Sequence, residues 1–231
     1  MKTPVVDYRE LRPSRLLEPR FIHLWLLLDW VGYLILYGLT ENLIPPEKCH
    51  VMHCFLDDLT PFCEWFIIPY CAWFLLIILS LGYFLLYDVD SFRRMQLFIM
   101  ITQIVAMAVY IIYPSRQDLR PAVMPRQNLL TALTEFIYSV DTPTGVCPSL
   151  HVAYSLGIAS VWMKYRGASQ AFKAFIVALA VTICLSTAFV KQHSYVDIFA
   201  AIPLSLLAEG IVYGKDWWMP RIKALLGGNG R

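Results

Sequence analysis

The chain is short of charge. Of its 231 residues only 16% are Asp, Glu, Lys or Arg, whereas about 25% is usual for a soluble domain. Hydrophobic residues make up 58%, above the roughly 45–50% of soluble domains, and the mean hydropathy is +0.56. The net charge of +2 is too small to indicate a nucleic-acid partner. A soluble core cannot use this much apolar surface, so the composition predicts that a membrane is the solvent.

The sequence also lacks internal repeats and low-complexity segments, which favours a single integral membrane domain over residues 1–231. Its first apolar run is long, and no small-residue cleavage site follows it. We therefore expect a retained membrane helix rather than a cleaved signal peptide. Residues 1–20, which precede this run, are expected to form an N-terminal segment on the cytoplasmic side.

Six apolar stretches approach the roughly 20 residues that a transmembrane helix needs. They are residues 21–39, 65–87, 95–113, 149–163, 171–190 and 195–213. The fourth is the weakest, because it is short and carries His151, a polar side chain that is expected to face the interior of the bundle. Residues 40–64 and 114–148 are the two long loops. The predicted fold class is all-α, a polytopic membrane protein with a six-helix transmembrane bundle.

Basic residues predict the orientation in the membrane. With six spans, the side that holds both termini carries 14 Lys and Arg and the opposite side carries 5, which together are the 19 in the chain. Because cytoplasmic loops carry the excess of basic residues, we expect cytoplasmic termini and outward-facing long loops, in the plasma (cell) membrane. Residues 215–231 are a cytoplasmic tail, in which Trp217 and Trp218 favour a short interfacial helix.

Two histidine motifs lie at helix ends on the expected outer side. The first, residues 147–151, places His151 in the first turn of the fourth helix, after Ser149 as the N-cap. Such a helix N-terminus suits an anion like phosphate. The second motif places His193 and Asp197 four residues apart at the start of the sixth helix, which predicts that they share one face. An Asp that holds an imidazole makes the histidine a better nucleophile or base.

Basic side chains lie on the same side as these motifs. Arg116 and Arg120 follow the third helix, and Arg126 and Lys191 add further charge. Arginine forks match phosphate oxygens in a bidentate manner. Because three outer arginines run against the positive-inside bias, a local role is expected for them.

Three motifs occur in a fixed order within residues 103–210. They are Arg120-Pro121, Pro148-Ser149-x-His151, and Ser186 through His193-x-x-x-Asp197. In this order and spacing they resemble the type 2 phosphatidic acid phosphatase superfamily, whose members typically have a six-helix membrane core. The resemblance implies that residues 103–210 are the catalytic core.

The resemblance also implies a role for each matching residue. His193 would be the nucleophile that forms a phosphohistidine, and Asp197 would orient and activate it. His151 would protonate the leaving group. Ser149 and Arg120 would bind phosphate oxygens. No metal or other cofactor is required in this family.

The sequence departs from the family pattern at three positions. Tyr113 stands where a basic residue is usual, Leu150 replaces a glycine, and Thr187 replaces an arginine. The last two departures resemble the branch that includes the fungal inositol phosphorylceramide synthases, which are lipid phosphotransferases. Other cations would then hold the phosphate. The candidates are Arg116, Arg126 and Lys191.

Three functions follow as hypotheses. The first is hydrolysis of a lipid phosphate or prenyl pyrophosphate, the second is transfer of a phospho-headgroup to an alcohol, and the third is a non-catalytic lipid-binding protein. The intact set of His151, His193 and Asp197 argues against the third. The partners implied are a lipid phosphate substrate and membrane lipids, whereas the sequence indicates no protein partner.

Further polar residues carry weaker expectations. The first long loop holds a cluster that could bind zinc, form a disulfide in an outward-facing compartment, or keep free thiols. The cluster is Cys49, His50, His53, Cys54 and Cys63. Cys147 has no evident base beside it. Asp141 is expected to orient the loop before Cys147, and Gln103 and Glu209 are expected to form hydrogen bonds between helices.

Overall fold

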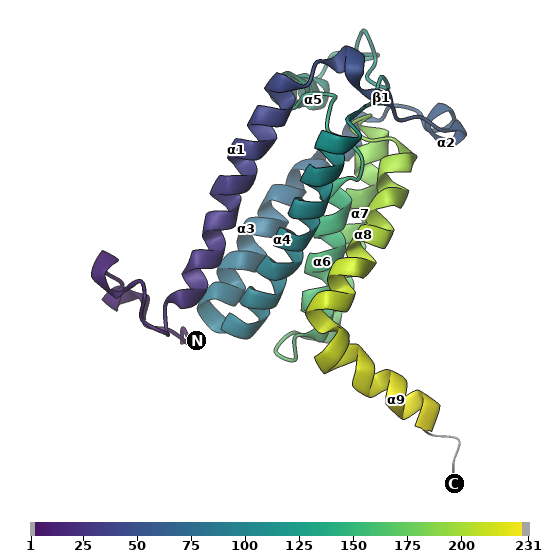
Figure 1. The fold of residues 1–231 in the computed structure, drawn as a ribbon. Helices are drawn as coiled ribbons and strands as arrows, with labels where there is room; N and C mark the ends of the chain where they lie inside the picture. The colour runs from purple at the N-terminus through teal and green to yellow at the C-terminus, as the bar shows by residue number, and fades with distance from the viewer. Residues whose placement is uncertain (1–2, 228–231) are drawn as a thin grey trace.

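The computed structural model describes residues 3–227 and consists of a bundle of long helices (Figure 1). Six helices form the bundle: α1 (Leu28–Leu43), α3 (Ile67–Tyr87), α4 (Val89–Ile112), α6 (Leu150–Lys164), α7 (Gln170–Phe189) and α8 (Tyr195–Tyr213). The 3₁₀ turns Ile22–Leu27 and Glu64–Phe66 lead into α1 and α3. The all-α fold expected from the sequence is confirmed.

Five helical segments in the described part of the chain are long and apolar enough to cross a membrane. They are Ile22–Leu43, Glu64–Tyr87, Val89–Ile112, Gln170–Phe189 and Tyr195–Leu225. Helix α6, with 15 residues, is not among them. It packs in the bundle against α3, α4, α7 and α8, and most of its residues are buried. A Cβ on Gly157 would lie 2.4 Å from the Phe98 ring, so glycine allows the close approach of α6 to α4.

Polar N-caps set where the later helices begin. Asp88 caps α4, Ser149 caps α6, Ser169 caps α7 and Ser194 caps α8, and each side chain accepts a hydrogen bond from an N–H of the first turn. These bonds satisfy donors that the helix itself leaves free. The expected cap at Ser149 is confirmed.

The two segments expected to be loops contain helices. Residues 40–64 hold the short helix α2 (Phe55–Leu59), and residues 114–148 hold α5 (Leu129–Val140). The two long connections between bundle helices thus each include a short helix. Helix α5 begins at a capping box on Asn128, but its 12 residues are too few to span a bilayer, so a search for long apolar runs misses it.

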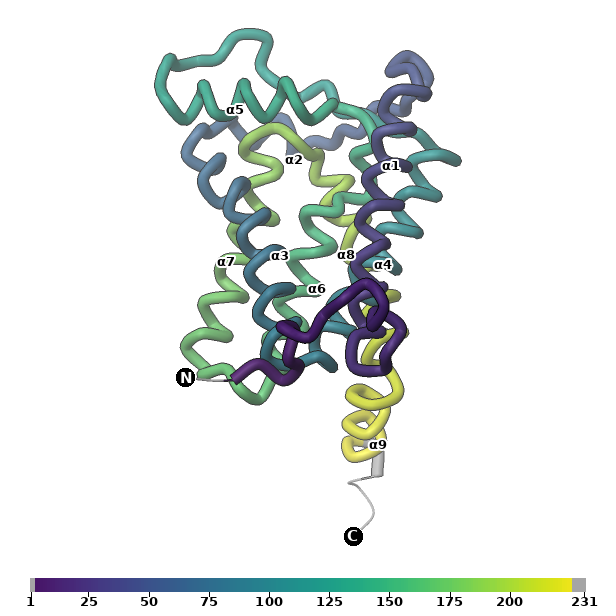
Figure 2. Tube along the Cα trace, turned by 90° about the vertical axis from the view of Figure 1, so that its left-hand side faces the viewer, coloured from purple at the N-terminus to yellow at the C-terminus, as the bar shows by residue number. Residues whose placement is uncertain are grey.

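The bundle has two distinct ends. Both termini lie at one end, and α2, α5 and the strands lie at the other (Figures 1 and 2). The two strands, β1 (His50–Val51) and β2 (Ser115–Arg116), pair in parallel. Because α6 and α8 begin at this second end with the two histidine motifs, we call it the histidine end, and we call the other the terminal end.

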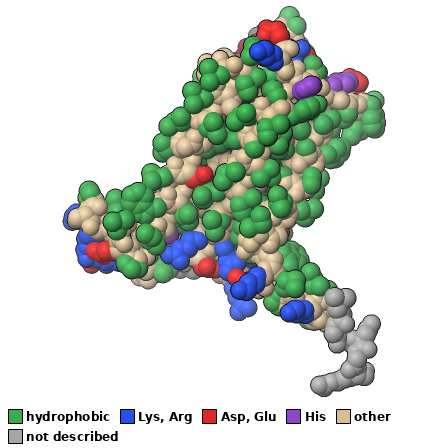
Figure 3. Space-filling view, in the orientation of Figure 1, with side chains coloured by type: hydrophobic (Ala, Val, Ile, Leu, Met, Phe, Trp, Pro, Cys, Tyr) green, Lys and Arg blue, Asp and Glu red, His purple; other side chains and the backbone are tan. Residues whose placement is uncertain are grey.

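Apolar side chains cover the visible face between the two ends, and charged side chains gather at the ends (Figure 3). This distribution is that of an integral membrane protein. At the terminal end the chain continues from α8 through a π-helical turn, Gly214–Trp218, into α9 (Met219–Gly227). The expected tail is helical as far as residue 227; residues 1–2 of the N-terminal segment and 228–231 of the tail lie outside the described residues.

Candidate active site

His193 and Asp197 form a buried pair at the start of α8. Nδ1 of His193 lies 3.3 Å from Oδ2 of Asp197, and the same oxygen accepts the N–H of Ser194 at 3.0 Å. Asp197 is fully buried and His193 is 8% exposed. The contact agrees with the four-residue spacing. His193 lies just before the helix rather than on its face, and its backbone N–H is held by the carbonyl of Thr187 at 3.1 Å.

His151 lies opposite this pair, in the first turn of α6. The centroids of the His151 and His193 rings are 5.6 Å apart. Tyr70 and Trp73 of α3 flank the His151 ring, with centroids at 4.6 and 4.1 Å. Nε2 of His151 is buried and has no hydrogen-bond partner among the described residues. A buried ring nitrogen without a partner is costly, so this atom marks a place for a polar group of a ligand.

Ser149 joins the two histidine motifs. Its backbone N–H donates to the backbone carbonyl of Asp197 at 3.1 Å, and its hydroxyl caps α6 by accepting the N–H of Val152. The residue is fully buried. Ser149 therefore fixes the start of α6 against α8, and its hydroxyl does not line the pocket described next.

A pocket of about 60 Å³ adjoins both histidine rings, and we call it the histidine pocket. This volume is roughly the room for a few water molecules, which is the scale of a phosphate group. Its wall carries Asp141, Thr142 and Thr144. None of the residues that line it in the described part of the chain is Lys or Arg. The two histidines thus meet at one pocket, with Asp197 held behind His193, whereas the basic candidates lie outside it.

Arg120 lies behind the pocket wall. Its guanidinium donates to the carbonyls of Tyr138 at 3.1 Å and Asp141 at 2.7 Å, and to Oε1 of Gln192 at 2.6 Å. It also lies over the Tyr138 ring, 4.4 Å from the centroid. Burial lowers the pKa of Arg120 from its ordinary value, although an arginine stays protonated. The cation contacts the pocket wall through Gln192, the neighbour of His193, and through the Asp141 carbonyl.

Asp141 is a pocket residue, which the sequence alone did not indicate. Its Oδ2 accepts hydrogen bonds from Gln192 Nε2 at 2.9 Å and the Tyr70 hydroxyl at 3.3 Å, and its Oδ1 accepts one from Tyr37 at 3.2 Å. It therefore ties α1 and α3 to the segment that carries His193. The carboxylate places negative charge beside a site that was expected to bind phosphate.

Lys191 points away from the pocket. Its Nζ donates to the carbonyls of Asp57 at 2.9 Å and Thr60 at 2.5 Å. Burial lowers the pKa of Lys191, because desolvation disfavours its charged form. The lysine anchors α2 against the start of α8.

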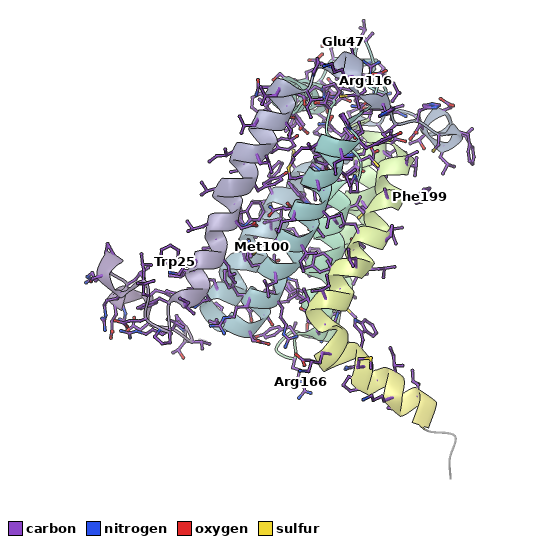
Figure 4. All side chains as sticks on the ribbon, viewed as in Figure 1. Trp25, Glu47, Met100, Arg116, Arg166 and Phe199 are labelled. Carbon is purple, nitrogen blue, oxygen red and sulfur yellow. The ribbon has the colours of Figure 1, made fainter. Side chains whose placement is uncertain are left out.

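Arg126 and Arg116 also have partners of their own. Arg126 forms an ion pair with Glu64, at 2.5 Å, and its side chain is 57% exposed. Arg116 pairs with Asp118 at 3.1 Å and lies near Glu47 at the histidine end of the bundle (Figure 4). Neither lines the histidine pocket.

Asp57 is a positioning residue that the sequence did not reveal. Its Oδ2 accepts the Ser194 hydroxyl at 2.6 Å and the Cys54 N–H at 2.7 Å, and its Oδ1 accepts the Tyr195 N–H at 3.0 Å. It is 3% exposed. Asp57 precedes Ser194 by 137 residues, so no local pattern connects them. Through Ser194 it holds the N-cap that fixes His193 beside Asp197.

In the described part of the chain, the cysteine and histidine cluster forms neither a disulfide nor a metal-binding group. All six cysteines are free, and within residues 3–227 no group of three or more His, Cys, Asp or Glu is placed to hold a metal ion. At the active site, burial and the nearby Asp197 carboxylate raise the pKa of the Cys147 thiol to about 12. The thiol is therefore protonated at neutral pH and is a poor nucleophile.

Comparisons with known proteins identify no relative of the chain. No protein-family model matches the chain, and neither a curated protein nor a solved structure matches it.

Proposed function

We propose that the protein is a membrane-embedded phosphatase that removes phosphate from a lipid phosphate or prenyl pyrophosphate through a phosphohistidine. The observation that carries this proposal is the His193–Asp197 pair opposite His151, around a pocket on the scale of a phosphate group. The motif order, which resembles the type 2 phosphatidic acid phosphatase superfamily, supports it. So does the membrane fold, since a lipid substrate lies in the bilayer.

The reaction proceeds in two displacements. In the first, Nε2 of His193 attacks phosphorus, and the bond from phosphorus to the leaving oxygen breaks. Asp197 holds the opposite ring nitrogen, which fixes the tautomer and stabilises the charged ring. His151 gives a proton to the leaving oxygen. In the second, water attacks phosphorus, the phosphorus–nitrogen bond breaks, His151 takes a proton from the water, and inorganic phosphate leaves.

The charge of the phosphate needs stabilisation from outside the pocket wall. The N-terminus of α6, where His151 lies, has a positive dipole end and N–H groups that the helix itself leaves free. Arg120 adds positive potential from behind Gln192. These two sources take the place of the arginine and lysine cradle that the sequence suggested from Arg116, Arg126 and Lys191.

The charge distribution supports an orientation in which the termini lie in the cytoplasm and the histidine end faces outward, in the plasma membrane. The substrate phosphate then enters from the outer leaflet. Cysteines introduced near Gln117 should react with membrane-impermeant reagents in intact cells, whereas one near Ser91 should not.

One observation favours phosphotransfer as a second candidate. Asp141, Thr142 and Thr144 offer the pocket a carboxylate, which repels a phosphate, and two hydroxyls, and all three groups can hydrogen-bond to an alcohol. A polyol acceptor could then attack the phosphohistidine in place of water. The Leu150 and Thr187 departures point the same way.

A substrate panel on the purified protein tests the proposal. The panel holds labelled phosphatidate, phosphatidylglycerophosphate, undecaprenyl pyrophosphate and an inositol phospholipid, each with and without excess inositol or glycerol. A phosphatase releases inorganic phosphate whether or not the polyol is present, whereas a transferase moves the label onto the polyol. A His193→Ala variant should do neither. A variant as active as the wild type would overturn the assignment, and an inactive wild type would support the non-catalytic alternative.

A further inference from the structure

Helix α1 packs loosely against the rest of the bundle. None of its described residues is buried, whereas each of the other bundle helices buries several. It runs along the edge of the bundle in both views (Figures 1 and 2). Between α1 and α4 lies a cleft of about 500 Å³, a volume within the range of ligand sites.

The α1–α4 cleft changes character along its length. Its apolar wall consists of Leu36, Ile104, Met107 and Ile111. Toward the terminal end it meets Asp29, which accepts a hydrogen bond from Gln96 at 3.4 Å, and Gln103. Both amide atoms of Gln103 are buried beside the Tyr154 hydroxyl. Gln103 and Ile111 are eight residues apart on α4, so the apolar part is about 12 Å long.

The cleft adjoins the histidine pocket at Tyr33, which lines both. On α4, Tyr110 lines the pocket and Met107, one turn earlier, lines the cleft. The two cavities therefore lie side by side along α1 and α4, at the level of Tyr33 and Tyr110. A larger apolar cavity of about 830 Å³ lies between α3 and α7, but none of its described lining residues also lines the pocket.

We infer that the α1–α4 cleft binds one hydrocarbon chain of the lipid whose phosphate occupies the histidine pocket. The inference rests on the proposed function. The chain passes Tyr33 and lies along the apolar wall, where burial of its surface contributes to binding. Asp29 marks where the apolar wall ends, because hydrocarbon packed against a carboxylate is unfavourable.

Two glycines of α1 allow a matched test. A Cβ on Gly32 or on Gly38 would meet no atom within 4 Å, so either position accepts a larger side chain without a clash. Gly32 lines the cleft, whereas Gly38 lines neither cavity. Gly32→Leu fills the cleft, and Gly38→Leu makes the same chemical change on the same helix outside it.

The variants are assayed on dioleoyl phosphatidate and on phenyl phosphate, which has no long chain. Gly32→Leu should lower kcat/KM for dioleoyl phosphatidate by about tenfold, the loss expected for roughly two buried methylene groups. It should leave phenyl phosphate hydrolysis unchanged, and Gly38→Leu should change neither rate. Equal rates on the phosphatidate for wild type and Gly32→Leu would overturn the inference. So would an equal loss on phenyl phosphate, because the effect would then not concern the chain.

A second measurement does not depend on turnover. Wild-type protein is irradiated with a phosphatidate that carries a photoreactive diazirine on its acyl chain, and the adducts are located by mass spectrometry. Adducts on α1 and α4 near Leu36 and Ile104, reduced in Gly32→Leu, support the cleft. Adducts confined to α3 and α7 would overturn it in favour of the larger cavity. Because this result does not require catalysis, an inactive protein with adducts in the cleft would contradict the proposed function alone.

Discussion

Helices α6 and α8 carry a polar cluster at each end, and the two clusters differ in how completely their groups are paired. At the terminal end, Nζ of Lys164 lies 2.6 Å from Glu209 and 2.5 Å from the Ser160 hydroxyl, and Trp218 donates to the same carboxylate at 2.7 Å. Among the described residues, none of these four side chains has a buried polar atom without a partner.

The histidine end is open by comparison. The His193–Asp197 contact is longer, at 3.3 Å, and Nε2 of His151 and Nε of Arg120 are buried without partners among the described residues. A closed network stabilises the fold, whereas an open one keeps bonding capacity for a ligand. If the proposed function holds, the two ends separate stability from chemistry on the same pair of helices.

The largest effect should follow from His193→Ala. The variant should lose at least about 10⁴-fold in turnover, since the covalent intermediate cannot form. Its melting temperature in detergent should stay near that of the wild type, because the ring already lies in an incompletely paired site. His53→Ala, which alters an exposed histidine, is the control and should keep its activity. Unfolding of His193→Ala would remove the contrast between the two ends.

Lys164→Met should have the opposite profile. It leaves Glu209 buried without its cation, so the free energy of unfolding should fall by about 3 kcal/mol. Activity per folded molecule should persist, because the site lies at the other end of α6. Chemical denaturation in detergent measures the loss. The double variant Lys164→Met, Glu209→Met should recover part of it, and no loss in the single variant would show that the closed network does not stabilise the fold.

Asp57→Asn tests the hydrogen bonds by which Asp57 holds the start of α8 at the histidine end. The amide nitrogen that replaces one carboxylate oxygen cannot accept a hydrogen bond, so the bond from either Ser194 or Tyr195 is lost and His193 should shift relative to Asp197. We expect kcat to fall by about 10- to 100-fold while KM stays, since misplacement of a catalytic group slows the chemical step. The control is Asp58→Asn, whose exposed carboxylate contacts only His53. A rise in KM with unchanged kcat would contradict the positioning role.

Arg126→Ala should have the smallest effect. The Arg126 side chain is 57% exposed and lies outside the histidine pocket, so we expect turnover within about twofold of the wild type. Steady-state kinetics on the best lipid substrate measure this. A large increase in KM would restore Arg126 as a phosphate ligand.

The sequence predicts the parts of the molecule that depend on local patterns. Long apolar runs locate the bundle helices, and the spacing of His193 and Asp197 predicts their contact because a helical turn brings such residues together. The N-cap at Ser149 is also predicted by a local pattern, a serine that directly precedes the first turn of a helix. The hydrogen bonds of Glu209 to α6 agree with its expected role between helices.

Partners that are distant in sequence could not be predicted. Arg120 was assigned to phosphate by type, but its two terminal nitrogens donate to groups 18 to 72 residues away. Asp57 accepts a hydrogen bond from Ser194, 137 residues away. Asp141 is held in the pocket wall by hydrogen bonds from side chains of α1 and α3. No local periodicity encodes these contacts, because tertiary packing alone brings the groups together. Helix α5 was missed for a different reason, since 12 residues fall below the length of a span.

Trapping the covalent intermediate tests the account most directly. Purified protein is mixed with phosphorus-labelled phosphatidate or undecaprenyl pyrophosphate, quenched within milliseconds to seconds under alkaline conditions that preserve phosphohistidine, and digested for mass spectrometry. The account predicts an acid-labile phosphoryl group on His193, which disappears when the labelled substrate is chased and is absent in His193→Ala. A phosphoryl group on another residue, or turnover with no labelled protein at any time, would contradict it.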